Sequence, residues 1–327
     1  MIVRGWKFVC ASLCAAVALS GHAEEVKVVK IGFGAPLTGF SASYGKDEEN
    51  AVRIAFDEAN AAGIVIAGQK IRFELDAQDD AGDPETAVLV GQRFVDEGVS
   101  GVIGHHNSGC SIAASSVYQR AGVPQISPSS SSPAYTAQGF NTTFRTISND
   151  SQMAVLAANY SVKQLGSKRI AVIDDSTDYA TNLVTEYVKA VQRAGGEVVT
   201  WQYTTTKSLD FRAVLTTIKG FTPDLIFYAG QDVQAAGLVK QIYQLGIKSK
   251  FMGEGGFTNE SFLKLAGPNA QGMYSWDYGL PLSRMPRAEV LESEPQMPDL
   301  QTRVYCRSRC AIHAAERVEG PMQKSRP

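Results

Sequence analysis

The strongest constraint on the fold is a repeated alternation of short β-branched runs with longer amphipathic segments. Val26–Phe33 and Arg169–Asp174 are runs typical of buried strands. Asp47–Ala62 and Asn182–Ala194 place most apolar residues on one face of a helix. Strands that alternate with helices of this length favour parallel sheets with helices on both faces.

The alternation stops near Phe144-Arg145-Thr146 and then starts again. We therefore predict an α/β fold of two doubly wound parallel-sheet lobes, residues 24–145 and 146–275, with residues 276–286 crossing back towards the first. Because ligands bind beyond the carboxyl ends of such strands, two facing lobes predict one ligand cleft between them. Further strands are predicted at 71–77, 102–103, 124–127, 197–203, 225–228, 250–252 and 272–276, and further helices at 84–95, 112–120, 151–165, 210–219, 233–245 and 262–265.

Residues 1–23 are typical of a secretory signal peptide. Arg4 and Lys7 precede an uncharged apolar run, Phe8–Leu19, which is shorter than a membrane span. Small residues then lead to Ala23, after which we expect cleavage. The predicted mature protein is soluble and periplasmic.

Composition argues against two classes of partner. Charged residues make up 20% of the 327 residues and the net charge is −2, so we expect neither a nucleic-acid partner nor a polybasic membrane surface. After removal of the signal peptide three cysteines remain. Export would allow Cys306 and Cys310 to form a disulfide, and Cys110 is then interpreted as a small buried residue.

The motifs that would indicate catalysis are incomplete. Gly32-x-Gly34 follows a strand as in a dinucleotide fingerprint, but position 37 is Leu where the third glycine belongs. His105 and His106 lack further ligands at metal-binding spacing, so we expect a partly exposed pair at a strand end. We therefore expect no catalytic residue, no cofactor and no metal, and the chain is not predicted to be an enzyme.

An ordered set of short segments resembles one family from about Val26 to about Pro281. The segments are Gly32–Gly39, Tyr44–Asp47, Asp79–Pro84, Gly104–His105, Ile126–Pro128, Phe144–Thr146, Phe251–Gly253 and Gly272–Met273. They resemble the leucine/isoleucine/valine-binding proteins of ABC importers. The resemblance implies a type I periplasmic binding protein, whose two lobes are joined by three crossovers and close on a ligand.

The resemblance also implies a function. The chain would be a monomeric periplasmic substrate-binding component that delivers a branched-chain amino acid, or a related amino-acid-like molecule, to an ABC permease in the inner membrane. The ligand shifts the equilibrium between the open and the closed protein by its higher affinity for the closed state. This function requires no chemical change of the ligand.

The candidate site begins with serines at strand ends. Ser108 lies just before a predicted helix, where free backbone N–H groups and the helix dipole favour an anion. The run Ser129-Ser130-Ser131 offers hydroxyls and loop amides at another strand end. By resemblance, Ser108, Ser129 and Ser131 hold the ligand carboxylate and part of its ammonium group.

The other candidate residues line the opposite part of the cleft. By resemblance, Tyr44 and Tyr179 match aromatic positions of the family. The family's acidic residue for the ligand ammonium is replaced here by Gly255. Because a buried ammonium without a partner is costly, Glu254 or Asp232 takes that role, or the ligand lacks the amine. Gln231 stands where some members have an aromatic residue, which argues against a leucine-like specificity.

The resemblance ends after about Met285. Arg287–Pro327 is rich in charged residues and lacks periodicity, so we predict a disordered or out-of-frame tail and a fold that is incomplete at its C-terminal end. The first lobe would then lack covering helices. Three alternative functions stay open at this point: an exported sensor of amides, urea or aromatic acids, a non-functional truncated product, and an exported hydrolase or dehydrogenase on the same architecture.

Overall fold

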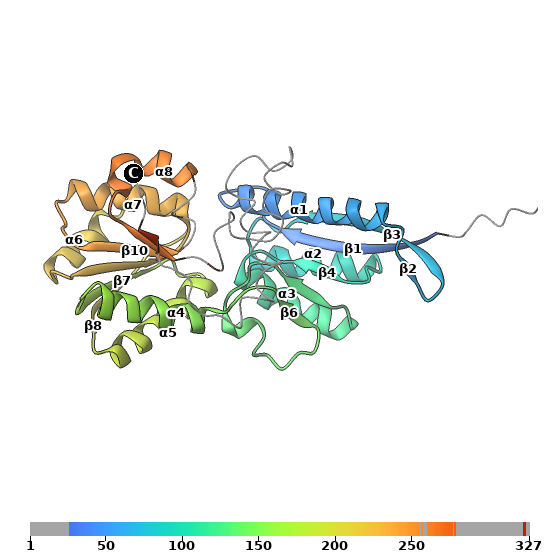
Figure 1. Cartoon of the computed structure of the whole chain (residues 1–327), viewed down its shortest axis with the longest axis horizontal. Helices are drawn as coiled ribbons and strands as arrows, with labels where there is room; N and C mark the ends of the chain where they lie inside the picture. Colours follow the sequence, from blue (N-terminus) through green and yellow to red (C-terminus); the bar gives the residue numbers. More distant parts are fainter. Residues whose placement is uncertain (1–25, 255–256, 258–259, 277, 279–322, 325–327) are drawn as a thin grey trace, which may run out of the picture.

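The computed structural model in Figure 1 describes residues 26–254, 257, 260–276, 278 and 323–324. Two open sheets with flanking helices follow one another along the long axis of the molecule. The predicted α/β architecture of two parallel-sheet lobes is confirmed. The predicted signal peptide, most of the predicted crossover and tail, and the Cys306–Cys310 pair lie outside the described residues. Within those residues, no helix is long and apolar enough to cross a membrane.

The first lobe is built on a sheet of order β2-β3-β1-β4-β5-β6, parallel except for the short β2. Its strands are β1 (Lys27–Ala35), β2 (Val65–Ile66), β3 (Gln69–Asp79), β4 (Val102–Gly104), β5 (Gln125–Ser127) and β6 (Thr143–Arg145). Its helices are α1 (Ala42–Ala61), α2 (Pro84–Asp96) and α3 (Ser108–Ala121), with a 3-10 turn at Pro133–Tyr135. The segment that we read as the break between the two series therefore contains the last strand of this sheet.

Local chemistry explains where the helices of the first lobe begin. The Asp83 side chain accepts the Thr86 N–H at 2.8 Å and Pro84 occupies the first turn, so α2 starts where the sequence predicts. In contrast, α1 begins at Ala42 and not at Asp47. A Cβ at Gly45 would lie 2.2 Å from the Pro36 carbonyl oxygen, so this glycine permits a close approach inside the helix and does not mark a loop.

The second lobe has a sheet of order β12-β11-β10-β9-β7-β8, parallel except for β12. Its strands are β7 (Arg169–Asp174), β8 (Glu197–Tyr203), β9 (Leu225–Ala229), β10 (Lys250–Glu254), β11 (Tyr274–Trp276) and β12 (Gln323–Lys324). Its helices are α4 (Asp150–Asn159), which continues as a π-turn at Tyr160–Gln164, α5 (Asp178–Ala194), α6 (Arg212–Gly220), α7 (Asp232–Gln244) and α8 (Glu260–Ala266). β12 comes from the predicted tail and pairs with Tyr274 and Ser275.

The second sheet is buried on both faces. Along β7, Ile170 and Val172 pack into the core under α4 and α5, while Ala171 and Ile173 pack into the core formed with α6, α7 and α8. Four consecutive buried side chains explain why this strand is a continuous apolar run in the sequence. In the first lobe, α2 and α3 cover one face of the sheet and α1 packs on the other.

Candidate functional site

A cavity of about 700 Å³ lies between the two lobes. Its first-lobe wall comes from the segments after β1, β3, β4 and β5, and its second-lobe wall from those after β7, β8, β9 and β10. The cavity therefore lies beyond the carboxyl ends of both parallel sheets, where such folds bind ligands. Seven of the predicted site residues line it: Tyr44, Ser108, Ser129, Ser131, Tyr179, Asp232 and Glu254.

The start of α3 lines the cavity. Ser108 is the first residue of this helix and is 3% exposed, and its Oγ accepts the Ser132 N–H at 3.2 Å. The first-turn N–H groups of a helix and its dipole favour negative charge. A Cβ at Gly109 would lie 2.8 Å from an Asp178 carboxylate oxygen. Glycine at the second position thus lets a side chain of the second lobe approach this helix start.

The serine run divides into lining and supporting residues. Ser129 and Ser131 line the cavity. Ser130 does not: its side chain is fully buried, and its hydroxyl donates to Ser111 Oγ at 2.6 Å. Its carbonyl accepts a hydrogen bond from Arg145 at 2.7 Å. The geometry thus assigns Ser130 to support of the loop, although the sequence groups it with the ligand-binding serines.

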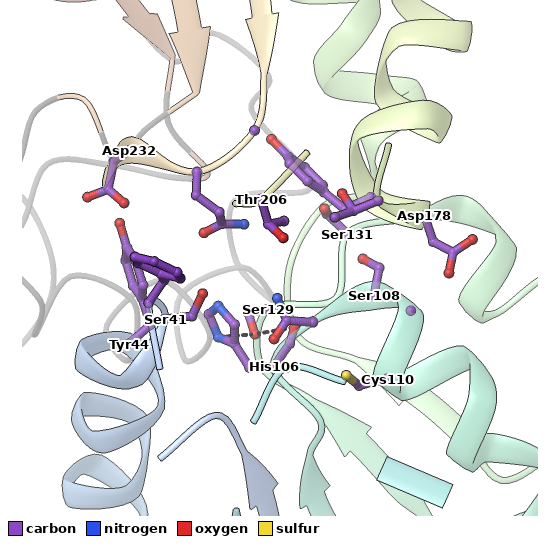
Figure 2. A pocket seen from close by; sticks show the side chains of 18 of the residues that line it. Ser41, Tyr44, His106, Ser108, Cys110, Ser129, Ser131, Asp178, Thr206 and Asp232 are labelled. Carbon is purple, nitrogen blue, oxygen red and sulfur yellow. Dashed lines mark hydrogen bonds between the residues drawn. The ribbon is translucent and has the colours of Figure 1, made fainter. Parts of the chain in front are cut away.

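His106 is a cavity residue that the sequence analysis did not select. In Figure 2 it lies between Tyr44 on one side and Ser108 on the other. Its ring stacks on Tyr44 with centroids 5.6 Å apart. Its Nδ1 lies 2.9 Å from Glu48 Oε1 and 3.1 Å from Ser129 Oγ. Glu48 is 58 positions away in the sequence, so no local signal could have revealed this pairing.

The prediction that the His105–His106 pair is partly exposed is wrong for His105. This side chain is fully buried. Its Nδ1 lies 2.6 Å from Asp80 and its Nε2 lies 2.9 Å from the Tyr118 hydroxyl. Both ring nitrogens are therefore used within the first lobe, and His105 positions the loop that carries His106 and Ser108.

The second-lobe wall carries the acidic groups. The Tyr179 hydroxyl donates a hydrogen bond to the carboxylate of Glu254, the last residue of β10. Asp232 is the first residue of α7 and is 7% exposed. Gln231 precedes it and also lines the cavity. Figure 2 shows Asp232 on the side of Tyr44, and Asp178 on the side of Ser108. Asp232 and Glu254 thus provide two carboxylates in the cavity wall that could accept hydrogen bonds from a cationic group.

A buried acid lies behind this wall. Asp150 accepts a hydrogen bond from the Tyr278 hydroxyl at 2.8 Å, and its backbone N–H donates to the Ser131 carbonyl at 2.9 Å. Desolvation, and then the charge of Glu254, raise the pKa of Asp150 to about 7. The Glu254 carboxylate therefore lies in surroundings where further negative charge is unfavourable, which a bound cation would relieve.

Two features bear on covalent and metal chemistry in this cavity. Burial raises the pKa of the Cys110 thiol, so it lacks the thiolate character of a nucleophile. Among the residues that the structure describes, no group of three His, Cys, Asp or Glu side chains could hold a metal ion. The cavity offers hydroxyl groups on both walls, with the carboxylates of Asp178, Asp232 and Glu254 on the second-lobe wall and that of Asp83 on the first-lobe wall.

Comparison with known proteins gives the same architecture. A family model described as "Periplasmic binding protein" matches residues 28–306, which extends past residue 285. The chain is 33% identical over 261 residues to the Leu/Ile/Val-binding protein homolog 1 of Brucella suis, covering 80% of this chain and 69% of the relative. It is 31% identical over 287 residues to the leucine-, isoleucine-, valine-, threonine- and alanine-binding protein of Pseudomonas aeruginosa, covering 87% and 74%.

Solved structures share the fold. The branched-chain amino acid transporter substrate binding protein LivJ of Streptococcus pneumoniae, in complex with isoleucine, superposes with a TM-score of 0.72 at 28% identity, over 91% of this chain and 86% of that one. A solute binding protein of R. palustris in complex with 4-hydroxybenzoate gives 0.75 at 22% identity, over 89% and 79%. The chain belongs to the periplasmic binding protein family, with the fold and relatives of the branched-chain amino acid binding proteins of ABC transporters.

Proposed function

We propose that this chain is the periplasmic substrate-binding component of an ABC importer that binds an amino-acid-like ligand by closure of its two lobes. The observation that carries the proposal is that the serines and the helix start of the first lobe share one cavity with Asp232 and Glu254 of the second lobe. A zwitterion presents one charge to each wall. Binding across both walls would stabilise the closed arrangement of the lobes.

The first wall suits a ligand that must be released again. Ser108, Ser129 and Ser131 provide hydroxyls beside the start of α3. Neutral donors hold a carboxylate without a full opposing charge, so its affinity stays moderate. On the second wall, Asp232 and Glu254 are the candidate partners of the ammonium group.

A thermal-shift series tests the proposal directly, because a ligand that binds only the native state raises its stability. The series uses L-leucine, L-isoleucine, L-valine, L-asparagine and L-aspartate beside two matched analogues of leucine: 4-methylpentanoate, which lacks its amine, and 3-methylbutylamine, which lacks its carboxylate. We expect saturable shifts for at least one amino acid and none for the analogues. A saturable shift only with the analogues, or no shift with any compound, would contradict the proposal.

The importer role implies further properties of the chain. Its partner is an inner-membrane ABC permease, the mature protein is monomeric, and the ligand is released chemically unchanged. Removal of residues 1–23 on export is part of the same proposal. Incubation with a bound amino acid, followed by mass spectrometry of the ligand, is expected to return the same mass.

The aromatic side chains of the cavity favour a second candidate, an aromatic carboxylic acid. Tyr44, Tyr179, Phe257 and Tyr278 all line the cavity, and flat rings stack on such side chains. This ligand has no ammonium group. Binding of 4-hydroxybenzoate that is unchanged by Asp232→Asn and Glu254→Gln, with no binding of amino acids, would favour this candidate over the first.

A further inference from the structure

His106 places an imidazole ring in the cavity wall, in addition to the serines and the acidic residues described above. The ring lies in the cavity wall of the first lobe, with 13% of its side chain exposed. Its two neighbours at Nδ1 are Glu48 and Ser129. Within the described part of the chain, its Nε2 has no hydrogen-bond partner. The polar atom available to a ligand is therefore Nε2.

The hydrogen bonds around Nδ1 determine where the ring protons lie. Ser129 Oγ donates to the His106 carbonyl at 3.0 Å, so its oxygen faces Nδ1 as an acceptor. Glu48 Oε1, at 2.9 Å, is also an acceptor. Nδ1 thus carries a proton in either charge state, and the additional proton of the imidazolium lies on Nε2.

The charged groups that surround the ring favour the imidazolium form. Glu48 on α1 faces it directly, and Asp80 after β3 and Glu254 at the end of β10 add negative charge. Burial lowers the pKa of His106, but these carboxylates outweigh burial and raise it above its usual value. Burial, and then the neighbouring Glu48 charge, raise the pKa of Asp47 to about 7, so Asp47 also contributes negative charge as the pH rises.

We propose that His106 is a specificity-determining residue whose Nε2–H donates to an oxygen acceptor on the ligand side chain, a carboxylate or a carboxamide. This inference rests on the function proposed above and names the ligand class within it: amino acids with an oxygen-bearing side chain in preference to aliphatic ones. The polar groups that share the wall, Ser41 and Asn107, agree with a wet side-chain pocket.

Three probes of almost the same shape test the preference: L-leucine, L-asparagine and L-aspartate, whose side chains all branch at the γ carbon. Titration calorimetry of the full chain at pH 6 is expected to give affinities for asparagine and aspartate about tenfold or more above that for leucine, because a hydrogen bond from a charged donor is the stronger kind. As the pH rises through the raised pKa of His106, the preference for aspartate is expected to shrink, since Nε2 loses its proton.

Variants separate this role from a structural one. His106→Leu is expected to reverse the order of leucine and aspartate, while His106→Gln, which keeps a neutral donor, retains asparagine binding and loses the pH dependence for aspartate. Glu48→Gln weakens aspartate binding at pH 7, because the imidazolium loses its counter-charge. Glu49→Gln is the matched control, since Glu49 pairs with Arg53 on the helix surface.

The outcomes distinguish the two proposals. If leucine binds more tightly than both polar probes at pH 6, or if His106→Leu leaves the aspartate-to-leucine ratio unchanged while leucine still binds, His106 does not set specificity and the proposed function stands. If neither these probes nor the amino acids of the thermal-shift series bind the wild-type chain, the proposed function fails and this inference fails with it. An unchanged melting temperature of His106→Leu shows that the variant is folded.

Discussion

The two lobes share a topology but differ in how completely their sheets are covered. In the second lobe, Val172, Phe227 and Met252 are register neighbours across β7, β9 and β10, and all three are fully buried. In the first lobe the matching row starts at Phe33, which is also fully buried, and continues through Ile103 to Ile126 and Phe144. Ile126 is 41% exposed and Phe144 is 49% exposed.

Among the described residues, α1 is the helix on this face of the first sheet, and it covers only part of the six strands. α1 packs against β1 and β3 through Val52 and Phe56, so the row is buried at that end. At β5 and β6 the apolar side chains remain accessible. That the first lobe lacks further covering helices stays a prediction, because most residues after Trp276 lie outside the described part of the chain. On the opposite face, α2 and α3 form a buried cluster with the sheet.

The largest expected effect is the loss of unfolding free energy when one aromatic ring is removed from each of these two rows of strand neighbours. Phe227 stacks on Tyr187 with centroids 3.6 Å apart and on Trp276 at 5.2 Å, so Phe227→Ala should lower the free energy of unfolding by about 3–5 kcal/mol. Phe144→Ala should cost less than about 1 kcal/mol, because half of its surface already contacts solvent.

Urea unfolding can separate the lobes in this experiment. Trp201 and Trp276 both lie in the second lobe, so their emission reports on that lobe, while far-UV circular dichroism reports on both. If Phe144→Ala destabilises the chain as much as Phe227→Ala, the β5–β6 end of the first sheet is covered in solution and the comparison is wrong.

Strong periodicity and capping made most of this fold predictable, and tertiary contacts account for the errors. Arg169–Asp174 and Glu197–Tyr203 are strands at the predicted bounds, because each is rich in β-branched residues. α3 begins at Ser108 and not at Ile112. The residues before Ile112 are mostly polar and show no helical spacing of apolar side chains, so the sequence alone does not predict that the helix starts there. The lining serines and tyrosines followed from the family resemblance, but His106 could not, because its partner lies on another element.

The second prediction compares one buried acid from each lobe. The pKa of Asp150 is raised from 3.8 to about 7, so the folded chain binds one more proton than the unfolded chain between these values. This stability is present below about pH 4 and is lost as the pH rises through 7. Asp150→Asn should remove this pH dependence. The unfolding free energy of the variant relative to wild type should therefore be about 2–4 kcal/mol higher at pH 8 than at pH 4.

Asp47 in the first lobe is the matched acid. Burial and Glu48 raise its pKa to about 7 as well, and Asp47→Asn should act in the same direction with a smaller amplitude, because this carboxyl is less deeply enclosed. The measurement is the difference in unfolding free energy between wild type and each variant from pH 4 to pH 8. A difference that grows towards low pH in favour of the variant would show that these acids are ionised in the fold.

The third prediction compares the two walls of the cavity. Ser108→Ala removes a neutral hydroxyl and should weaken amino-acid binding about tenfold. Asp232→Asn removes a charge that we propose faces the ligand ammonium and should weaken binding about 10- to 100-fold. Titration calorimetry with the amino acid that gives the largest thermal shift measures both. Unchanged affinity of Asp232→Asn would assign the ammonium to Glu254, for which Glu254→Gln is the test.

The smallest expected effects come from surface ion pairs, and they show where the difference between the lobes resides. Glu49 pairs with Arg53 at 2.5 Å in the first lobe, and Glu186 pairs with Lys189 at 2.8 Å in the second. Since solvent screens such pairs, Glu49→Gln and Glu186→Gln should each cost less than about 0.5 kcal/mol in urea unfolding. Equal small costs in both lobes would mean that their surfaces are equivalent and that the lobes differ through the cover of their sheets. A cost in one lobe several times that in the other would place the difference in surface charge instead.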